Sequence, residues 1–251
     1  MLVSVQEYHI KSKLAVAYQL IHSPEVSRHI PDTDLLREYS FKKMTKKYDK
    51  VYIKPDRGRK SRGVIRIEKG KNGLYKMRHG THTQEVDSND LWTKVKEIAG
   101  DTKYVIQQAV ESVTNGGRHF DLRCHAVRVN GKWKVGGICG RLGQRGSIIT
   151  TSHHGGTRRC LKRFFSRHLG YSKQQSLNMK RRLDKCVLNT VRRVSQMYPN
   201  LIEFAVDIGI DRKKRIWIYE VNIEPLTRGN FKMLPDLTLY RRIQSMRRKA
   251  K

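Results

Sequence analysis

The dipeptide Asn130-Gly131, which separates two runs of alternating polar and apolar residues, most constrains how this chain can fold. The runs cover residues 120–129 and 132–138, and such alternation is typical of strands with one buried face. Asn-Gly readily adopts the positive φ angles of a type I′ turn, whose twist matches that of paired strands. The sequence therefore predicts an antiparallel hairpin at this point.

Further strands and helices follow no strict β-α-β alternation along the chain. Short apolar or alternating runs predict strands at residues 51–54, 64–67, 74–77, 104–110, 204–210 and 216–223. Helical spacing of apolar residues, or a polar helical pattern, predicts helices at residues 11–22, 34–47, 88–99 and 173–198. This mixture favours an α+β fold built from more than one lobe. The basic segment after Tyr240 is expected to be frayed.

The composition is strongly basic. Lys and Arg number 53 and Asp and Glu 22, so the formal net charge of the 251 residues is +31. Such a charge predicts a polyanionic partner, and nucleic acid, a nucleotide, an anionic polymer and an acidic membrane surface are all left open. No apolar run approaches about 18 residues, so no membrane span is expected. The polar start of the chain is unlike a signal peptide, which favours a cytoplasmic location. The four cysteines lack metal-ligand spacing and are expected to be reduced thiols.

The last predicted hairpin carries a candidate metal site. Strand side chains alternate between faces, so Glu220 and Asn222 point the same way, and Asp207 shares a face with Ala205 and Gly209. If the two polar faces coincide, Asp207, Glu220 and Asn222 converge. Two carboxylates and one amide oxygen suit Mg²⁺. A solvated strand face would have the same spacing.

Candidate anion-binding residues lie earlier in the chain. Lys54 ends a strand and precedes a loop with Gly58 and Gly63, and glycines let backbone N–H groups approach a phosphate. The loop is not a Walker A motif, because Val64-Ile65 stands where Lys and Ser or Thr would be needed. A flexible basic turn is the alternative.

Two arginines also suit an anion. Arg123 shares a strand face with Asp121, and Arg141 follows the next predicted strand. Arginine makes bidentate contacts to phosphate and stabilises charge that develops during phosphoryl transfer. Each is equally compatible with a plain surface charge in so basic a chain.

The order of these blocks resembles the ATP-grasp superfamily, and within it the YheC/YheD endospore coat-associated branch. The resemblance covers roughly residues 10 to 230. The matching stretches are His29-Ile30-Pro31-Asp32-Thr33, Val51-Tyr52-Ile53-Lys54-Pro55, Val105-Ile106-Gln107-Gln108-Ala109-Val110, Phe120-Asp121-Leu122-Arg123, Phe204-Ala205-Val206-Asp207-Ile208-Gly209-Ile210-Asp211 and Glu220-Val221-Asn222-Ile223.

This resemblance implies an ATP-grasp fold, with ATP held between two α+β lobes. The expected divisions are residues 1–33 as an N-terminal helix and leader, 34–110 as the first lobe, 111–230 as the second lobe and 231–251 as a basic C-terminal tail. Only about ten residues precede the predicted first helix. The separate domain that precedes the lobes in most family members is therefore expected to be absent or vestigial.

The resemblance also implies roles for individual residues. ATP would be bound by Lys13, Lys54, Gly58, Ser61, Gly63, Gln107, Gln108 and Val110. The phosphates and an acylphosphate would be held by the catalytic Arg123 and Arg141. Mg²⁺, or Mn²⁺ in its place, would be bound by Asp207, Glu220 and Asn222. An active-site loop would contain His153, Gly155 and Gly156. Family members often carry Glu where Gln107 stands, but the Gln107 amide oxygen can still accept a hydrogen bond from adenine.

The implied activity is that of an ATP-dependent ligase. A carboxylate attacks the γ-phosphate of ATP, and an amine or thiol then displaces phosphate from the resulting acylphosphate. A triphosphate accounts for little of the +31 charge, so an acidic small molecule, peptide or polymer is the expected second substrate. The alternative is a nucleic-acid-binding or structural coat protein on an inactive ATP-grasp scaffold. A spore or spore-coat location is the alternative to the cytoplasm, and the oligomeric state is left open.

Overall fold

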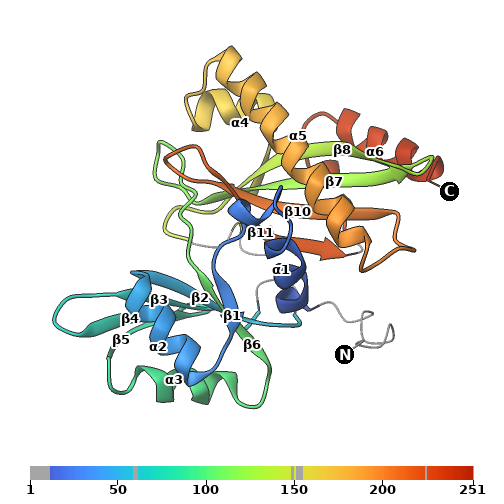
Figure 1. The fold of residues 1–251 in the computed structure, drawn as a ribbon. Coiled ribbons are helices and arrows are strands. Elements are labelled where there is room, and N and C mark those ends of the chain that lie inside the picture. Colours follow the sequence, from blue (N-terminus) through green and yellow to red (C-terminus); the bar gives the residue numbers. More distant parts are fainter. Residues whose placement is uncertain (1–11, 59–61, 148–149, 151–154, 224, 251) are drawn as a thin grey trace. The chain divides into compact units, whose positions relative to one another are not determined.

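A computed structural model describes residues 12–58, 62–147, 150, 155–223 and 225–250. Within these residues the chain forms two compact units, each described separately here (Figure 1). The N-terminal unit comprises residues 12–18 and 31–110, and the C-terminal unit comprises residues 19–30 and 111–250. The boundary falls once within helix α1 (Lys13–Ile21) and again after residues 30 and 110.

The N-terminal unit is built on a six-stranded antiparallel sheet in the order β1-β6-β2-β3-β4-β5. Its strands are β1 (Thr33–Leu35), β2 (Lys50–Pro55), β3 (Ile65–Lys69), β4 (Leu74–His79), β5 (His82–Asp87) and β6 (Tyr104–Gln108). Its helices are α2 (Glu38–Lys47) and α3 (Leu91–Ala99), which pack Phe41, Met44 and Val95 against Val51 and Ile53 of the sheet. Because side chains alternate along β2, Val51 and Ile53 are buried while Lys54 stays partly accessible.

Two elements of this unit differ from the sequence expectation. The predicted helix over residues 34–47 begins only at Glu38, because Thr33–Leu35 instead pairs with β6. β5 was not predicted, since it lies at the sheet edge and Val86 is its single buried residue. β1 depends on pairing with β6, which is distant in sequence, whereas β5 pairs with the neighbouring β4 at an exposed edge; local propensity reveals neither strand.

The C-terminal unit has a five-stranded antiparallel sheet in the order β11-β10-β7-β8-β9. Its strands are β7 (Phe120–Val129), β8 (Lys132–Leu142), β9 (Thr157–Cys160), β10 (Glu203–Ile210) and β11 (Ile216–Ile223). Its helical elements are η2 (Ser27–His29), α4 (Leu161–His168), α5 (Lys173–Ser195), η4 (Arg228–Lys232) and α6 (Thr238–Arg248). Asn130 and Gly131 have φ angles of 50° and 72°, which confirms the turn that joins β7 to β8.

Alternation along β7 gives this sheet two different faces. Leu122, Cys124 and Ala126 lie on one face and are buried in a unit whose long helix α5 crosses β7, β8 and β10 (Figure 1). The other face carries polar residues at the start of β7, and its apolar end, from Val127 to Val129, is covered by η4 and α6. The start of β7 is therefore where polar side chains gather on the sheet.

The expectation of a frayed segment after Tyr240 is wrong. Residues 238–248 form α6, and Ile243 is fully buried against the sheet. Gly136 and Gly137 on β8 make the approach possible, because a Cβ atom at Gly136 would lie 3.0 Å from Cγ1 of Ile243. At the other end of the helix, Arg247 forms a two-pronged ion pair with Glu203 of β10. None of the helices described is both long and apolar enough to cross a membrane.

Candidate functional site

A row of charged side chains crosses all five strands of the C-terminal sheet on one face. In an antiparallel pair, directly opposite residues place their side chains on the same face. Asp207 lies opposite both Glu220 and Arg123. Asp121 lies opposite Arg141, which in turn lies opposite Arg158. From β11 to β9, this charged row consists of Glu220, Asp207, Arg123, Asp121, Arg141 and Arg158. It is acidic at the β11 end and basic at the β9 end.

Arg141 is the centre of the charged row. Its guanidinium group donates from Nε and Nη2 to the Asp121 carboxylate, with an Nη2–Oδ2 distance of 2.7 Å. Nη2 also lies 2.9 Å from Oδ2 of Asp207. Burial alone would lower the pKa of Arg141, but the two carboxylates outweigh it and hold that pKa above its ordinary value. One buried cation therefore joins two buried carboxylates.

Asp207 is held from both sides. Its Oδ1 lies 2.9 Å from Nε of Arg123, and its Oδ2 accepts a hydrogen bond of 3.2 Å from Nδ2 of Asn222. Burial would raise the pKa of Asp207, but Arg123 and Arg141 outweigh it and lower that pKa below its ordinary value. The carboxylate is therefore ionised at neutral pH. The Oδ1 atom is buried and lacks a well-aligned hydrogen bond, so it retains a lone pair that a cation could use.

Three members of this cluster were missed as site residues by sequence reasoning. Asp121 was noted only as a neighbour of Arg123, yet it accepts from both Arg141 and Thr150, whose Oγ1 lies 2.6 Å from Oδ2. Arg158 was not singled out from the sequence as a site residue, yet it is buried. Thr150 carries no sequence signal. Thr157-Arg158-Arg159-Cys160 shows no alternation of polar and apolar residues, so no local pattern indicated the strand that buries Arg158.

In the N-terminal unit, Lys54 and Gln107 interact across the β2–β6 pair. Nζ of Lys54 donates to Oε1 of Gln107 at 2.7 Å, and Nε2 of Gln107 donates to Oγ1 of Thr33 at 2.9 Å. The Gln107 amide oxygen, expected to accept from adenine, already accepts from Lys54. Gln108 ends β6, and its Oε1 accepts from the Asp32 backbone at 3.4 Å. Val110 follows two residues later.

The glycine-containing loop after β2 is tied to α1. Nζ of Lys13 donates to the carbonyl oxygens of Pro55 and Gly58 at 3.0 and 3.3 Å. Gly63 has a φ angle of 70°, and a Cβ atom there would lie 2.8 Å from the Tyr104 hydroxyl, so the position requires glycine. Gly58 is exposed and makes only ordinary contacts. Ser61, also expected in this loop, lies outside the described residues.

The predicted active-site loop is described only at its end. His153 lies outside the described residues. Gly155 has a φ angle of 68°, and a Cβ atom there would lie 2.0 Å from Nε2 of Gln144. Gly156 is buried, and its carbonyl oxygen accepts a hydrogen bond from Arg158. This loop therefore ends beside the basic end of the charged row.

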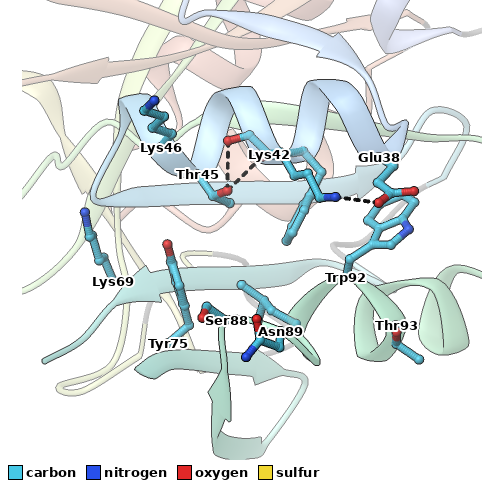
Figure 2. Close-up of a pocket in the computed structure, with 12 residues that line it drawn as sticks. Glu38, Lys42, Thr45, Lys46, Lys69, Tyr75, Ser88, Asn89, Trp92 and Thr93 are labelled. Carbon is cyan, nitrogen blue, oxygen red and sulfur yellow. Dashed lines mark hydrogen bonds and ion pairs between the residues drawn. The ribbon is translucent and has the colours of Figure 1, made fainter. Parts of the chain in front are cut away.

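A groove of about 490 Å³ in the N-terminal unit is separate from these residues. Figure 2 shows it between α2 on one side and β4 with the start of α3 on the other. Lys42, Lys46, Lys69, Tyr75 and Trp92 are among its lining residues. None of the residues predicted for the site lines it, so the groove is not part of the site that the sequence predicted.

Comparison with protein families matches nearly the whole chain to one family. A model of the YheC/D-like ATP-grasp family matches residues 4–247. The chain belongs to the YheC/D-like ATP-grasp family. This confirms the resemblance drawn from the sequence blocks. Endospore coat-associated protein YheD of Bacillus subtilis (strain 168) is 26% identical over 186 residues, which are 71% of this chain and 40% of that protein. The chain thus spans well under half the length of this relative.

Solved ATP-grasp structures share the fold of this family member. VanG D-Ala:D-Ser ligase from Enterococcus faecalis superposes with a TM-score of 0.55 at 11% identity, covering 93% of this chain and 61% of that chain. The ATP-grasp ligase PsnB, complexed with a phosphomimetic variant of its minimal precursor, Mg and ADP, gives 0.54 at 10% identity, covering 98% and 60%. L-amino acid ligase from Bacillus licheniformis gives 0.53 at 12% identity, covering 87% and 41%. These likenesses confirm the predicted ATP-grasp fold.

The acidic end of the charged row has donor atoms suited to the divalent cation expected in an ATP-grasp protein. Asp207 and Glu220 lie directly opposite each other on β10 and β11, and Asn222 donates to Asp207. Carboxylate and amide oxygens are hard ligands, which Mg²⁺ prefers. The poorly aligned, buried Oδ1 of Asp207 supports this fit. No group of three or more His, Cys, Asp and Glu is arranged for a metal in the part of the chain described, so the amide of Asn222 is needed to complete the set.

Proposed function

We propose that this protein binds Mg·ATP and uses it to join a carboxylate to an amine or a thiol through an acylphosphate. The observation that carries the proposal is the charged row, where Arg123 and Arg141 are buried and immobilised beside Asp207 and Glu220. Phosphoryl transfer requires fixed positive charge and a divalent cation more than a protein nucleophile. The row provides the fixed positive charge and the oxygen ligands that would hold such a cation on one sheet.

The proposed roles follow from how each side chain is held. The carboxylates fix Arg123 and Arg141, so these cations can stabilise developing phosphoryl charge without reorganising. Asp207, Glu220 and Asn222 would hold Mg²⁺, or Mn²⁺ in its place, and that ion would neutralise phosphate charge. In the N-terminal unit, Lys54 would exchange its bond to Gln107 for a phosphate oxygen of ATP. Gln107 would then be released to bind adenine.

The remaining ATP contacts are proposed on the same basis. Backbone N–H groups of the loop after β2 would bind the phosphates. Lys13 contacts this loop at Gly58, and Gly63 lies at its end. Gln108 and Val110, at the end of β6 and after it, would line the adenine side. Gly155 and Gly156 would form the described part of the active-site loop. We place the protein in the cytoplasm or the spore coat, the latter by analogy with the name of the YheD relative.

The second substrate is proposed to be acidic. Beyond the residues of the site, the chain carries a large excess of Lys and Arg within its net charge of +31. A field of this sign concentrates anionic small molecules, peptides and polymers near the surface. An acidic acceptor would therefore be favoured over a neutral one at low ionic strength.

The proposal is tested by nucleotide calorimetry and by phosphate release. Wild-type protein should bind Mg·ATP, and Glu220→Gln should abolish or strongly weaken binding in the presence of Mg²⁺. Glu97→Gln, an exposed position on α3, removes the same charge away from the site and should bind as wild type does. A screen of candidate carboxylates and amines should then identify pairs that accelerate phosphate release. Folded wild-type protein that binds no nucleotide would rule out the proposal.

A second candidate function is polyanion binding on an inactive scaffold, which α5 favours. Seven residues of this helix are basic and one is acidic. The basic residues are Lys173, Lys180, Arg181, Arg182, Lys185, Arg192 and Arg193. If these residues bind nucleic acid, the logarithm of the binding constant should fall linearly with the logarithm of the salt concentration. The slope should be about −0.9 for each phosphate neutralised. Binding to duplex DNA without such a slope, or none at low salt, would exclude this candidate.

A further inference from the structure

Arg158 is the residue of the charged row whose charge the sheet does not balance. It lies on the edge strand β9, directly opposite Arg141, and only 6% of its surface is exposed. Arg123 and Arg141, the other two arginines of the row, each lie within 2.9 Å of a carboxylate oxygen. Among the described residues, no Asp or Glu carboxylate lies within ion-pair distance of Arg158.

Backbone carbonyl groups hold the Arg158 side chain in place. Its Nε donates to the Gly229 carbonyl oxygen, and its Nη1 donates to those of Thr150 and Gly156, each at 3.3 Å. In the described part of the chain, Nη2 has no acceptor. These contacts come from η4 and from two residues that precede β9, Thr150 and Gly156. The guanidinium group is therefore oriented by neutral partners, with one nitrogen left over.

The electrostatic surroundings of Arg158 disfavour its charge. Burial, followed by repulsion from Arg141, lowers the pKa of Arg158 below its ordinary value. Asp121, the carboxylate of the row that lies nearest in order to Arg141 and Arg158, already binds Arg141 and Thr150. A buried cation without a counter-ion is unfavourable, and binding of an anion would relieve that cost.

We propose that Arg158 binds an oxyanion, a carboxylate or a phosphoryl group, of the molecules that react at this site. This inference rests on the proposed ligase function and extends it, because it adds a third cationic contact at the β9 end of the row. Arginine is suited to the task because its planar fork matches the geometry of both groups.

The test uses Arg158→Met in the full-length protein, with Arg159→Met as the matched control. Arg159 is the next residue of β9, so its side chain leaves from the opposite face while the loss of charge is the same. Calorimetry would follow the binding of inorganic phosphate and of succinate, each with and without Mg·ADP. Phosphate represents the phosphoryl group, and succinate represents a substrate carboxylate.

We expect Arg158→Met to lower the affinity for one of these probes by about 10- to 100-fold, as loss of a charged hydrogen bond predicts. Arg159→Met should leave the affinity for both probes unchanged. If only phosphate binding is weakened, Arg158 binds the phosphoryl group. If only succinate binding is weakened, Arg158 binds the substrate carboxylate. Unchanged binding of both probes, equal losses in both variants, or no binding of either probe to wild type would overturn the inference.

Two further readouts keep the outcome decisive. Arg158→Lys retains the charge without the fork, so it should bind the affected probe with an intermediate affinity; it also replaces Arg158→Met if that variant does not fold. Wild-type affinity in Arg158→Lys would refute the geometric argument. Failure of Mg·ADP to bind would defeat the proposed ligase function, whereas the nucleotide-free titrations would still decide the role of Arg158.

Discussion

Replacing Arg141 by methionine should destabilise the C-terminal unit more than any exposed substitution. Methionine approximates the length of the side chain but removes the cation that joins Asp121 to Asp207. Asp207 would keep its contacts with Arg123 and Asn222, whereas Asp121 would keep, among the residues described, only the hydroxyl of Thr150. Removing one partner of a buried ion pair costs about 3–5 kcal/mol. Most of that cost should come from the carboxylate of Asp121.

Urea denaturation followed by tryptophan fluorescence measures this effect. Trp133 and Trp217 lie in the C-terminal unit, and Trp92 lies in the N-terminal unit. A Trp92→Phe background therefore makes the signal specific for the unit that contains the substitution. With a slope of about 2–3 kcal/mol per molar urea, a loss of about 3–5 kcal/mol should lower the midpoint by about 1–2.5 M.

A double variant separates the lost ion pair from lost packing. Asp121→Asn combined with Arg141→Met removes both charges and keeps an acceptor for Thr150. It should be more stable than Arg141→Met alone, with a coupling free energy of about 2–3 kcal/mol. A loss below about 1 kcal/mol in Arg141→Met, or no recovery in the double variant, would refute the view that Arg141 balances a buried carboxylate.

Three further predictions concern other parts of the molecule. Ile243→Ala should cost about 2–5 kcal/mol of unfolding free energy because the side chain is fully buried, whereas Leu226→Ala, 77% exposed, should cost under about 0.5 kcal/mol; equal small losses would contradict the docking of α6. Burial lowers the pKa of His125 below its ordinary value of 6.5, so the unfolded state takes up a proton at a higher pH than the folded state does, and the protein loses stability as the pH falls through that range. His125→Asn should therefore flatten the dependence of unfolding free energy on pH between about pH 7 and 5. An unchanged slope would show that His125 is not the group responsible. Lys54→Met should weaken Mg·ATP binding about tenfold or more, as loss of a charged contact predicts, with the exposed Lys94→Met unaffected; identical affinities would remove Lys54 from the proposed ATP site.

Local sequence signals were sufficient where a few neighbouring residues decide the structure. Asn130-Gly131 predicted the β7–β8 hairpin because the turn conformation depends on those two residues alone. Alternation put Glu220 and Asn222 on one strand face, but whether Asp207 shared that face was decided by the register of the β10–β11 pair, which shifts between Asp207 and Ile208. The blocks that indicated the ATP-grasp family belong to elements of this kind.

Sequence reasoning failed where an element depends on a distant partner. β9 is a strand because it pairs with the end of β8, and that pairing buries Arg158, a residue that the sequence did not single out for the site. The basic segment after Tyr240 was expected to be frayed, yet it belongs to α6, whose Ile243 contacts two glycines of β8 that lie about a hundred residues earlier.

The sequence by itself thus determined the α+β class, the main hairpins and the types of side chain that the site would use. The tertiary structure alone decided which of these charges neutralise one another. Arg141 pairs with both Asp121 and Asp207, whereas Arg158 faces only carbonyl oxygens among the described residues. The reason is physical: the interaction of two charges depends on their separation and burial, and both quantities arise only when strands distant in sequence are paired.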